Sequence, residues 1–329
     1  MKNLLSENDH VVGLDIGGTK MMAVVYNGKW QDIGRCKKKS KFSKEEPAEA
    51  RVIRVVAEAL EAAGNVSIKG IGVGSPGPLD PVSGVIIDTP NLAWKNFPLA
   101  KILSDRFSVP VVVDNDVNVG TYGEWSFGPL KDCAHVVGIF PGTGIGGGVI
   151  IDRKLLHGFS GAAGEVGHMT LMEDGPFCGC GKRGCLEALA SRIAIAKEVA
   201  ALAARGDAPY IAANCGTDLN NIRSNVLAQA IKAGDSMVEE VVRKAAFHVG
   251  IAVGNLINIL SPEAVILGGG LVEAMPSLYL EEVKNAVKLH AMPFLRKGVR
   301  IEVAKLGDDA VVRGAARMIA ERLTEKNKK

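Results

Sequence analysis

The sequence predicts an α/β protein of two domains. It has 329 residues, more than one small hydrophobic core requires, and its 47% hydrophobic and 23% charged residues are typical of a folded globular chain. Short apolar runs, typical of strands, alternate with longer segments that have helical periodicity. Each half of the chain also contains an apolar strand that ends in glycines, at residues 15–18 and 267–270. We therefore expect two α/β halves of roughly similar design.

The smaller N-terminal domain is expected to span residues 1–118. Residues 11–16 form a buried apolar run that ends in a glycine turn, and 21–26 form a second strand, so the chain opens with a hairpin. The other expected elements are a helix over 48–63, a strand over 68–74 that enters a rigid proline loop, a strand over 109–113, and a helix that starts near Asn115, with Asp114 or Asn115 as its cap.

The larger C-terminal domain is expected to span residues 119–329, with part of the last helix returning to the first domain. Two strands, at 135–140 and 148–151, flank a glycine-rich turn, and an irregular segment rich in glycine and cysteine follows at 158–187. Long helical patterns then alternate with two further strands. The expected helices cover 186–205, 226–233, 236–259, 278–289 and 310–323, and the expected strands cover 265–267 and 299–304.

Composition excludes several classes of partner. The net charge is only +3 and no basic patch with interleaved aromatic residues occurs, so no nucleic-acid partner is expected. Residues 1–10 lack the apolar core of a secretory signal, and the apolar segment 245–260 is too short and too polar for a membrane span. Gly250 and Gly254 within it are interpreted as sites of close helix packing. We expect a cytoplasmic location with reduced cysteines, which favours metal binding over disulfides.

Two familiar phosphate-binding motifs do not fit the chain. No run matches the Walker pattern G-x-x-x-x-G-K-[ST]. Residues 142–147 match G-x-G-x-x-G, but a β-branched run at 149–151 follows where a dinucleotide-binding fold requires a helix. A phosphate site in this chain must therefore be of a different kind.

A glycine hairpin at residues 15–20 is the alternative. Gly17 and Gly18 let backbone N–H groups approach a phosphate closely, and Thr19 adds a hydroxyl donor. Asp15 supplies a carboxylate suited to a hydrated magnesium ion. Taken alone, the same residues are equally compatible with an ordinary tight turn.

Taken together and in order, four segments resemble the ROK family of sugar kinases and sugar-responsive repressors. They are the D-x-G-G-T-K motif at 15–20, the D-N-D segment at 114–116, the glycine run at 142–148 and the cysteine cluster at 178–185. The resemblance extends from about Val11 to the final helix. It implies the two-domain actin-like ATPase (ribonuclease H-like) fold, with a ligand-binding cleft between the domains.

The resemblance also implies how a nucleotide binds. The β- and γ-phosphates of ATP, with magnesium, are expected at two glycine turns, and a third glycine run is expected near the adenosine. The residues concerned are Asp15, Gly17, Gly18, Thr19, Lys20, Gly142, Thr143, Gly144, Gly268, Gly269 and Gly270.

Three cysteines within eight residues, Cys178, Cys180 and Cys185, predict a metal site together with His168 upstream. Three thiolates and one imidazole make a closed tetrahedral set for zinc, which leaves no open position for catalysis. The family resemblance also marks this segment as a zinc signature. We therefore expect a structural zinc ion that fixes a loose loop. One ring nitrogen of His168 would bind zinc while the other donates to a sugar hydroxyl.

Phosphoryl transfer to a sugar needs a carboxylate that accepts the hydroxyl proton. Asp116 follows a buried strand and matches the family's catalytic base, whereas Asp114 fits the role of a helix cap better. The substrate-binding residues that the resemblance implies are Asn91, Asn115, Asp116, Glu165, His168 and Glu187. On sequence alone, the two glutamates are equally compatible with solvated loop charges.

The sequence therefore predicts an ATP-dependent kinase that phosphorylates the 6-hydroxyl of a hexose, with glucose as the preferred substrate. N-acetylmannosamine and N-acetylglucosamine are alternative substrates, because fold and motif do not decide between sugars. A non-catalytic sugar-sensing regulator is the alternative of a different class. The early start of the glycine motif, at Asp15, and the intact Asp116 argue against it. The resemblance further implies a homodimer or a higher homo-oligomer.

Overall fold

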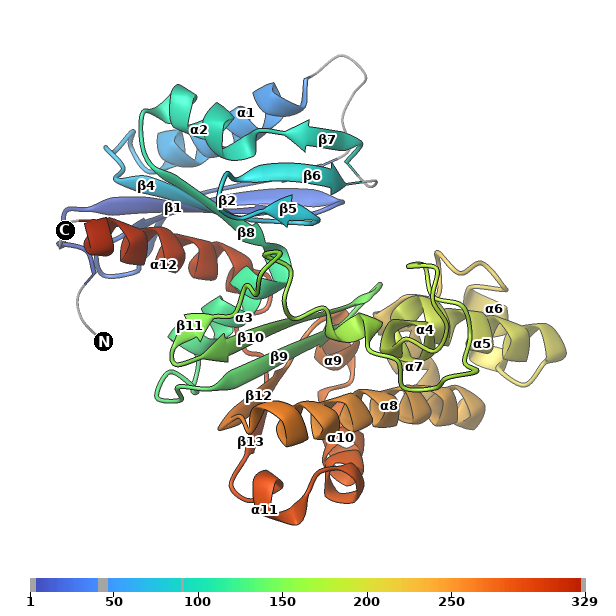
Figure 1. The fold of residues 1–329 in the computed structure, drawn as a ribbon. Helices are drawn as coiled ribbons and strands as arrows, with labels where there is room; N and C mark the ends of the chain where they lie inside the picture. The colour runs from blue at the N-terminus through green and yellow to red at the C-terminus, as the bar shows by residue number, and fades with distance from the viewer. Residues whose placement is uncertain (1–3, 41–46, 90–91, 327–329) are drawn as a thin grey trace. The chain divides into compact units, whose positions relative to one another are not determined.

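The chain divides into two units in the computed structural model, which describes residues 4–40, 47–89 and 92–326 (Figure 1). The first unit comprises Met1–Asp132, Leu155–Ala163 and Asp308–Lys329, and the second comprises Cys133–Lys154 and Gly164–Gly307. The first unit thus ends at residue 132 rather than at 118. It also takes in the segment 155–163 and the whole of the last helix.

Helix α3 (Asp116–Phe127) belongs to the first unit because it packs closely against α12 (Asp309–Lys326). A Cβ atom built on Gly123 would lie 2.0 Å from the carbonyl oxygen of Ala310, and one on Gly314 would lie 1.9 Å from a carbonyl oxygen of α3. Only glycine at these two positions lets the helix backbones touch. Because of this packing, the first unit extends beyond residue 118, where its end was predicted.

A five-stranded sheet with helices on both faces forms the first unit. Its elements are β1 (His10–Ile16), β2 (Lys20–Asn27), β3 (Asp32–Lys39), α1 (Ala48–Ala62), β4 (Gly70–Ser75), α2 (Leu99–Phe107) and β8 (Val111–Asn115), with a small sheet of β5 (Leu79–Asp80), β6 (Val85–Thr89) and β7 (Trp94–Phe97). The strand order is β3-β2-β1-β4-β8, in which β1, β4 and β8 are parallel. Helices α1 and α2 cover one face, and α12 with α3 covers the other (Figure 1).

Successive residues of β1 enter two different hydrophobic cores. Val12 and Leu14 pack in the core on the α1 side, whereas Val11 packs with α12. Side chains of a strand alternate between its faces, so a strand covered on both sides appears in the sequence as an unbroken apolar run. Glycines again allow the close approach, because Cβ atoms on Gly13 and Gly72 would lie 1.9 and 1.8 Å from carbonyl oxygens of α12.

A second five-stranded sheet forms the centre of the second unit. Its strands are β9 (Val136–Pro141), β10 (Ile145–Ile151), β11 (Lys154–Leu155), β12 (Ala264–Leu267) and β13 (Arg300–Val303), in the order β11-β10-β9-β12-β13. β9, β12 and β13 are parallel, and β10 returns antiparallel to β9. Within β11, after Lys154, the chain returns to the first unit.

The helices of the second unit carry the rest of its core. They are η1 (Val166–His168), α4 (Leu186–Ala190), α5 (Arg192–Arg205), α6 (Pro209–Asn214), α7 (Ser224–Lys232), α8 (Ser236–Leu260), α9 (Gly270–Ala274), α10 (Pro276–His290) and α11 (Pro293–Arg296). The predicted close packing is confirmed, because a Cβ on Gly250 of α8 would lie 2.8 Å from the backbone of α10. Within the described residues, no helix is long and apolar enough to cross a membrane.

One predicted helix, over 186–205, is two helices in the structure. The chain leaves helical geometry at Ser191, whose side chain accepts a hydrogen bond from the N–H of Ala194 and so caps α5. The apolar periodicity hides this break, because both helices bury residues in the same core. The break has a consequence for the site, since it places the first turn of α5 beside a glycine turn.

Candidate functional site

Parallel pairing brings two predicted site segments and the predicted proline loop to one edge of the first unit's sheet. Asp15 pairs with Gly74, and Gly74 pairs with Asp114, so the carboxyl ends of β1, β4 and β8 coincide. The glycine turn after β1, the proline loop after β4 and the D-N-D segment therefore lie at the same edge. Open α/β sheets bind ligands at the carboxyl ends of their strands.

The turn at residues 17–19 is held by hydrogen bonds to its carbonyl groups. The N–H of Gly17 donates to the carbonyl of Lys20 at 2.9 Å and closes the hairpin. Buried Ser40 donates through its hydroxyl to the carbonyl of Gly17 at 2.6 Å and through its N–H to that of Thr19 at 2.8 Å. These bonds fix the shape of the turn and use none of the N–H groups of Gly18 and Thr19, which a phosphate would bind.

The carboxyl group of Asp15 lies among other charges at this edge. Its pKa is raised to about 7, chiefly by burial and next by the neighbouring carboxylate of Asp116, while Lys20 opposes the change. Two carboxylates that repel each other favour a cation between or beside them. The arrangement therefore fits the predicted role of Asp15 as a magnesium ligand.

Lys20, the last residue of the glycine motif, is bound to Asp308 just before α12. Its Nζ lies 2.5 Å from Oδ1 of Asp308, and Nζ of Lys37 lies 2.9 Å from Oδ2 of the same carboxylate. Asp308 thus holds two lysines beside the turn. The sequence gives no local sign of this contact, because Asp308 lies 288 residues from Lys20.

Asn115, rather than Asp114, is the N-cap of α3. Its side-chain oxygen accepts hydrogen bonds from the N–H groups of Val117 at 2.9 Å and Asn118 at 3.2 Å. Of the two caps that the sequence offers, Asp114 does not serve, because its carboxylate is only 1% exposed and accepts from Asn115 and Asn118 instead. Asp116 is consequently the first residue of α3, where the positive end of the helix dipole favours an ionised carboxylate.

Asp114 is buried and stabilises the rest of the D-N-D segment through three hydrogen bonds. It accepts from the N–H of Asn115 at 2.7 Å and from the side-chain amide of Asn118 at 3.2 Å. Its other oxygen lies 2.5 Å from Nε2 of His157, in the segment 155–163. This hydrogen bond raises the pKa of His157, and burial opposes the effect. The His157–Asp114 pair is a contact that sequence reasoning missed.

Two glycine turns of the second unit also meet at one edge of a sheet. β9 and β12 are parallel, so the turns that follow them, at 142–144 and 268–270, lie at the same edge. A Cβ on Gly269 would lie 2.7 Å from the carbonyl oxygen of Pro141, and its φ of +80° is one that favours glycine. A Cβ on Gly268 would lie 2.5 Å from the ring of Phe140. Larger residues would push the two turns apart.

Glu187 of α4 is bound to the first of these turns. Its Oε2 accepts a hydrogen bond from the N–H of Ile145 at 2.9 Å, and a Cβ on Gly144 would lie 2.4 Å from the same oxygen. The N–H of Gly142 donates to the carbonyl of Gly144 at 2.8 Å and closes the turn. A glutamate predicted to bind the sugar therefore also fixes the turn predicted to bind phosphate.

His168, Cys178, Cys180 and Cys185 come together as a possible metal site, with one ligand atom of each within 4.8 Å of the others. The two sulfurs of Cys180 and Cys185 lie 3.7 Å apart, and Sγ of Cys178 lies 3.7 Å from Nδ1 of His168. Sulfurs on a tetrahedral zinc with bonds of about 2.3 Å lie about 3.8 Å apart, so the four residues fit such an ion. Nε2 of His168 stays on the other side of the ring.

Tight turns make this cluster possible. The N–H of Cys178 donates to the carbonyl of Lys182 at 2.8 Å, which brings the first two cysteines round one loop. Gly184 has a φ of +67°, and a Cβ there would lie 1.5 Å from the carbonyl oxygen of Met172. Cys185 then begins α4, two residues before Glu187. The cluster and the phosphate turn are therefore joined through one short helix.

Glu165 stands at the start of the 3-10 helix that carries His168. Gly164 before it has a φ of +98°, and a Cβ on Gly167 after it would lie 2.1 Å from the carbonyl oxygen of Ile145. The short helix is thus pressed against β10, which fixes Glu165 and His168 on the second unit. Asn91, the remaining predicted sugar ligand, lies outside the described residues.

The ROK family model matches residues 11–322 of the chain. This chain belongs to the ROK family. Its sequence is 33% identical over 322 residues to a glucokinase from Halalkalibacterium halodurans, with 94% of each chain covered. It is also 36% identical over 253 residues to a xylose repressor from Caldicellulosiruptor bescii, which covers 77% of this chain and 62% of the repressor. The relatives of this ROK protein thus include sugar kinases and sugar-responsive repressors.

The ROK fold is shown at the level of structure as well. The crystal structure of a ROK family glucokinase from Streptomyces griseus in complex with glucose and AMPPNP is similar to this chain with a TM-score of 0.79 and 30% identity. The match covers 94% of this chain and 98% of the other. The predicted two-part α/β, actin-like ATPase fold is therefore confirmed for this ROK chain.

Four residues beside the ROK motifs escaped prediction, and all act through long-range contacts. Ser40 holds the first glycine turn, Asp308 holds Lys20, and His157 supports Asp114. The fourth, Arg192, contacts the turn at 142–144. Only Arg192 has a local signal, a charged residue directly after the helix-capping Ser191.

Proposed function

We propose that this ROK protein is a kinase that transfers the γ-phosphate of ATP to the 6-hydroxyl of glucose. The observation that carries the proposal is the place of Asp116, at the carboxyl edge of the first unit's sheet and in the first turn of α3. A carboxylate there can accept a proton, and the glycine turn that carries phosphate donors follows a strand of the same sheet edge. The similarity to glucokinases over 94% of the chain supports glucose as the substrate.

In the proposed reaction, the oxygen of the sugar 6-hydroxyl attacks the γ-phosphorus of ATP. The bond from that phosphorus to the bridging β–γ oxygen breaks, and ADP leaves with that oxygen. The hydroxyl proton passes to the carboxylate of Asp116. The turns at 17–19 and 142–144 hold the phosphates through backbone N–H groups, and residues 268–270 lie near the adenosine.

Magnesium is the metal proposed at Asp15, where the repulsion between the carboxylates of Asp15 and Asp116 would be relieved. A bound magnesium ion neutralises charge on the phosphate oxygens. The two lysines held by Asp308 add positive charge on the same side of the turn. The residues of the first unit therefore supply both the cation site and the proton acceptor in this proposal.

Zinc is proposed at the four-residue cluster, in a structural role. Four protein ligands fill a tetrahedral site and leave no position for substrate. Because Nδ1 of His168 faces Cys178, Nε2 is the ring nitrogen that is left to donate to a sugar hydroxyl. Asn91, Asn115, Glu165 and Glu187 are the other proposed sugar ligands.

A panel of sugars with ATP tests the proposal. We expect ADP release, followed in a coupled assay, with kcat/KM for glucose at least tenfold above the values for N-acetylmannosamine, N-acetylglucosamine and fructose. A higher kcat/KM for an N-acetylated sugar would support the kinase activity and show that this sugar, rather than glucose, is the substrate. ADP release with none of the sugars would contradict the kinase itself.

A sugar-responsive regulator is the second candidate, because the chain is 36% identical to a xylose repressor over 253 residues. A regulator of this kind would bind a sugar and release no ADP. Calorimetric titration with glucose and with xylose, next to the ADP assay, separates the two functions. Binding of either sugar without turnover would favour the regulator.

A further inference from the structure

Arg192, the first residue of α5, is attached to the glycine turn at 142–144 by its main chain and its side chain. Its N–H donates to the carbonyl of Gly142 at 2.8 Å. Its Nη2 donates to the hydroxyl of Thr143 at 3.3 Å, and its Nη1 donates to the carbonyl of Ile222 at 3.3 Å. The guanidinium group is therefore held in a fixed place beside the turn.

The charge of this guanidinium is not balanced by an acidic group. No carboxylate pairs with Arg192 or with Arg223 in the part of the chain that the structure describes, and Nε of Arg223 donates to the carbonyl of Asn220 at 3.3 Å. Burial lowers the pKa of Arg192, and the nearby charge of Arg223 lowers it further. Arginine stays protonated in proteins, so the guanidinium of Arg192 brings a positive charge to the glycine turn, and the charge of Arg223 lies near it.

The same place is next to the second glycine turn. Ser224 follows Arg223 directly, and its hydroxyl oxygen would lie 3.5 Å from a Cβ built on Gly270. Residues 222–224 therefore lie between the guanidinium of Arg192 and the turn at 268–270. The first turn of α5 adds the positive end of a fourteen-residue helix. Every one of these residues belongs to the second unit.

We propose that Arg192, with Arg223 beside it, binds a phosphate group of the nucleotide. Guanidinium groups form charge-assisted, often paired hydrogen bonds with phosphate oxygens. Two of the five N–H donors of Arg192 are used within the protein, which leaves donors for a ligand. The hydroxyl of Thr143 is held at the same time, so Arg192 also orients one of the predicted phosphate contacts. This inference rests on the proposed function.

A ligand series tests the proposal on the full chain. Calorimetry measures Kd for adenosine, AMP, ADP, AMPPNP and glucose 6-phosphate with the wild type and with Arg192→Gln. We expect the variant to bind adenosine with a Kd within about twofold of the wild-type value. Its affinity should fall about tenfold or more for the shortest nucleotide that contains the phosphate bound by Arg192, and for every longer one. Arg192→Lys, which keeps the charge, should recover part of the loss.

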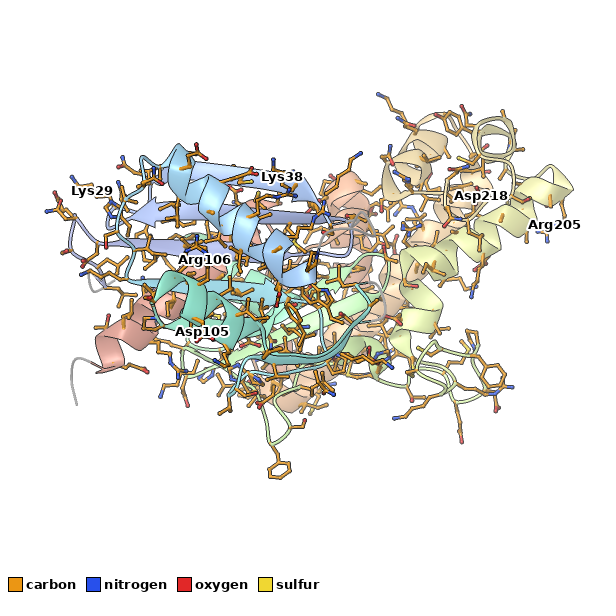
Figure 2. All side chains as sticks on the ribbon, turned by 90° about the horizontal axis from the view of Figure 1, so that it is seen from above. Lys29, Lys38, Asp105, Arg106, Arg205 and Asp218 are labelled. Carbon is orange, nitrogen blue, oxygen red and sulfur yellow. The ribbon has the colours of Figure 1, made fainter. Side chains whose placement is uncertain are left out.

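Arg205→Gln is the matched control, because Arg205 ends the same helix and pairs with Asp207 at 3.0 Å on the surface (Figure 2). Its affinities should equal those of the wild type. An equal loss for adenosine and the phosphorylated ligands, or no loss, would overturn the proposal and leave the kinase standing. A loss confined to glucose 6-phosphate would assign the arginines to the product and also overturn it. A wild type that binds no nucleotide would remove the proposed function as well.

Discussion

Each of the three residues of the D-N-D segment has a different role in the structure. Asp114 is buried and holds the segment through Asn115, Asn118 and His157. Asn115 caps α3 with its side-chain oxygen, which fixes the first turn of the helix. Asp116 follows as the first helical residue and accepts from the N–H of Val117 at 2.9 Å. Its carboxylate is thereby oriented before any substrate binds.

Replacing Asp116 with asparagine should remove turnover and keep sugar binding. The amide has nearly the same shape and cannot accept the hydroxyl proton, so we expect kcat to fall by about 10²–10⁴-fold. The Kd for glucose, measured by calorimetry, should change little. Asp105→Asn is the control, because Asp105 is exposed on α2 and pairs there with Lys101 (Figure 2). Retained turnover in Asp116→Asn would exclude Asp116 as the proton acceptor.

The His157–Asp114 hydrogen bond should make stability depend on pH. The folded state raises the pKa of His157 through this bond. Its stabilisation is therefore fully present below the unfolded value of about 6.5 and is lost as pH rises through the folded pKa. Because His157 is 36% exposed, we discount the effect to about 1 kcal/mol, or roughly 2–4 °C in Tm.

Thermal unfolding of His157→Gln and of the wild type checks this prediction. The measurements run from about pH 5.5 to about pH 9, below and above the unfolded histidine pKa of about 6.5. The wild type should exceed the variant in Tm at the acidic end, and the difference should shrink at the alkaline end. His135→Gln is the control, since His135 lies 3.6 Å from a carboxylate that is exposed, that of Asp152. A difference that grows with pH would contradict the assigned charge state.

At the scale of elements, the loop from His168 to Cys185 connects three parts of the second unit. His168 ends the 3-10 helix pressed on β10, and Cys185 begins α4. Glu187 of α4 then binds the N–H of Ile145 after the glycine turn. A metal at the cluster would therefore fix Glu165, His168 and Glu187 together, although it touches only one of them.

Loss of the proposed zinc should weaken sugar binding more than nucleotide binding. Cys180→Ser removes one ligand of four, and we expect the KM for glucose to rise at least tenfold while the KM for ATP changes less than threefold. Metal content, measured by mass spectrometry, should fall from about one zinc per chain. Cys215→Ser is the control, because that thiol lies outside the cluster and bonds to the carbonyl of Asn221. Equal changes in the KM for glucose and the KM for ATP would contradict a specific effect of the metal on sugar binding.

At the scale of the whole molecule, the chain passes between its two units four times. The passages follow residues 132, 154, 163 and 307, so neither unit is one continuous stretch. The last passage delivers α12, which closes one face of the first unit's sheet and supplies Val312, Ala316 and Ile319 to a buried core. The first unit is consequently incomplete until α12 has been made.

A chain that ends at residue 307 should fail to fold its first unit. Removal of α12 exposes the core around Val11 and the carbonyl-lined glycines of β1 and β4. Burial of several large side chains is worth about 1.5–3 kcal/mol each, which exceeds typical domain stability in sum. We expect loss of the cooperative thermal transition of that unit and of ATP turnover. A chain that lacks only residues 327–329 should unfold like the wild type; a cooperative first unit without α12 would refute the account.

Sequence patterns predicted most of the elements, and the motifs they singled out lie at the two sheet edges and in the cysteine cluster. The apolar run at 11–16 and the glycine motif at 15–20 are local patterns, so each can be recognised from consecutive residues alone. The cysteine spacing likewise predicted a cluster that the structure brings within ligand distance. The break at Ser191 was missed, because the residues on both sides of it are buried in the same core and keep the apolar periodicity unbroken.

By itself, the sequence determined the α/β elements, the order of the glycine, acidic and cysteine motifs, and thereby the ROK family. Only the tertiary structure decided where the units begin and end, and which distant residues support the motifs. Ser40, Asp308, His157 and Arg192 reach their partners across the sheets and helices of each unit. The physical reason is that a motif is set by neighbours along the chain, whereas burial, pairing and charge balance are set by neighbours in space.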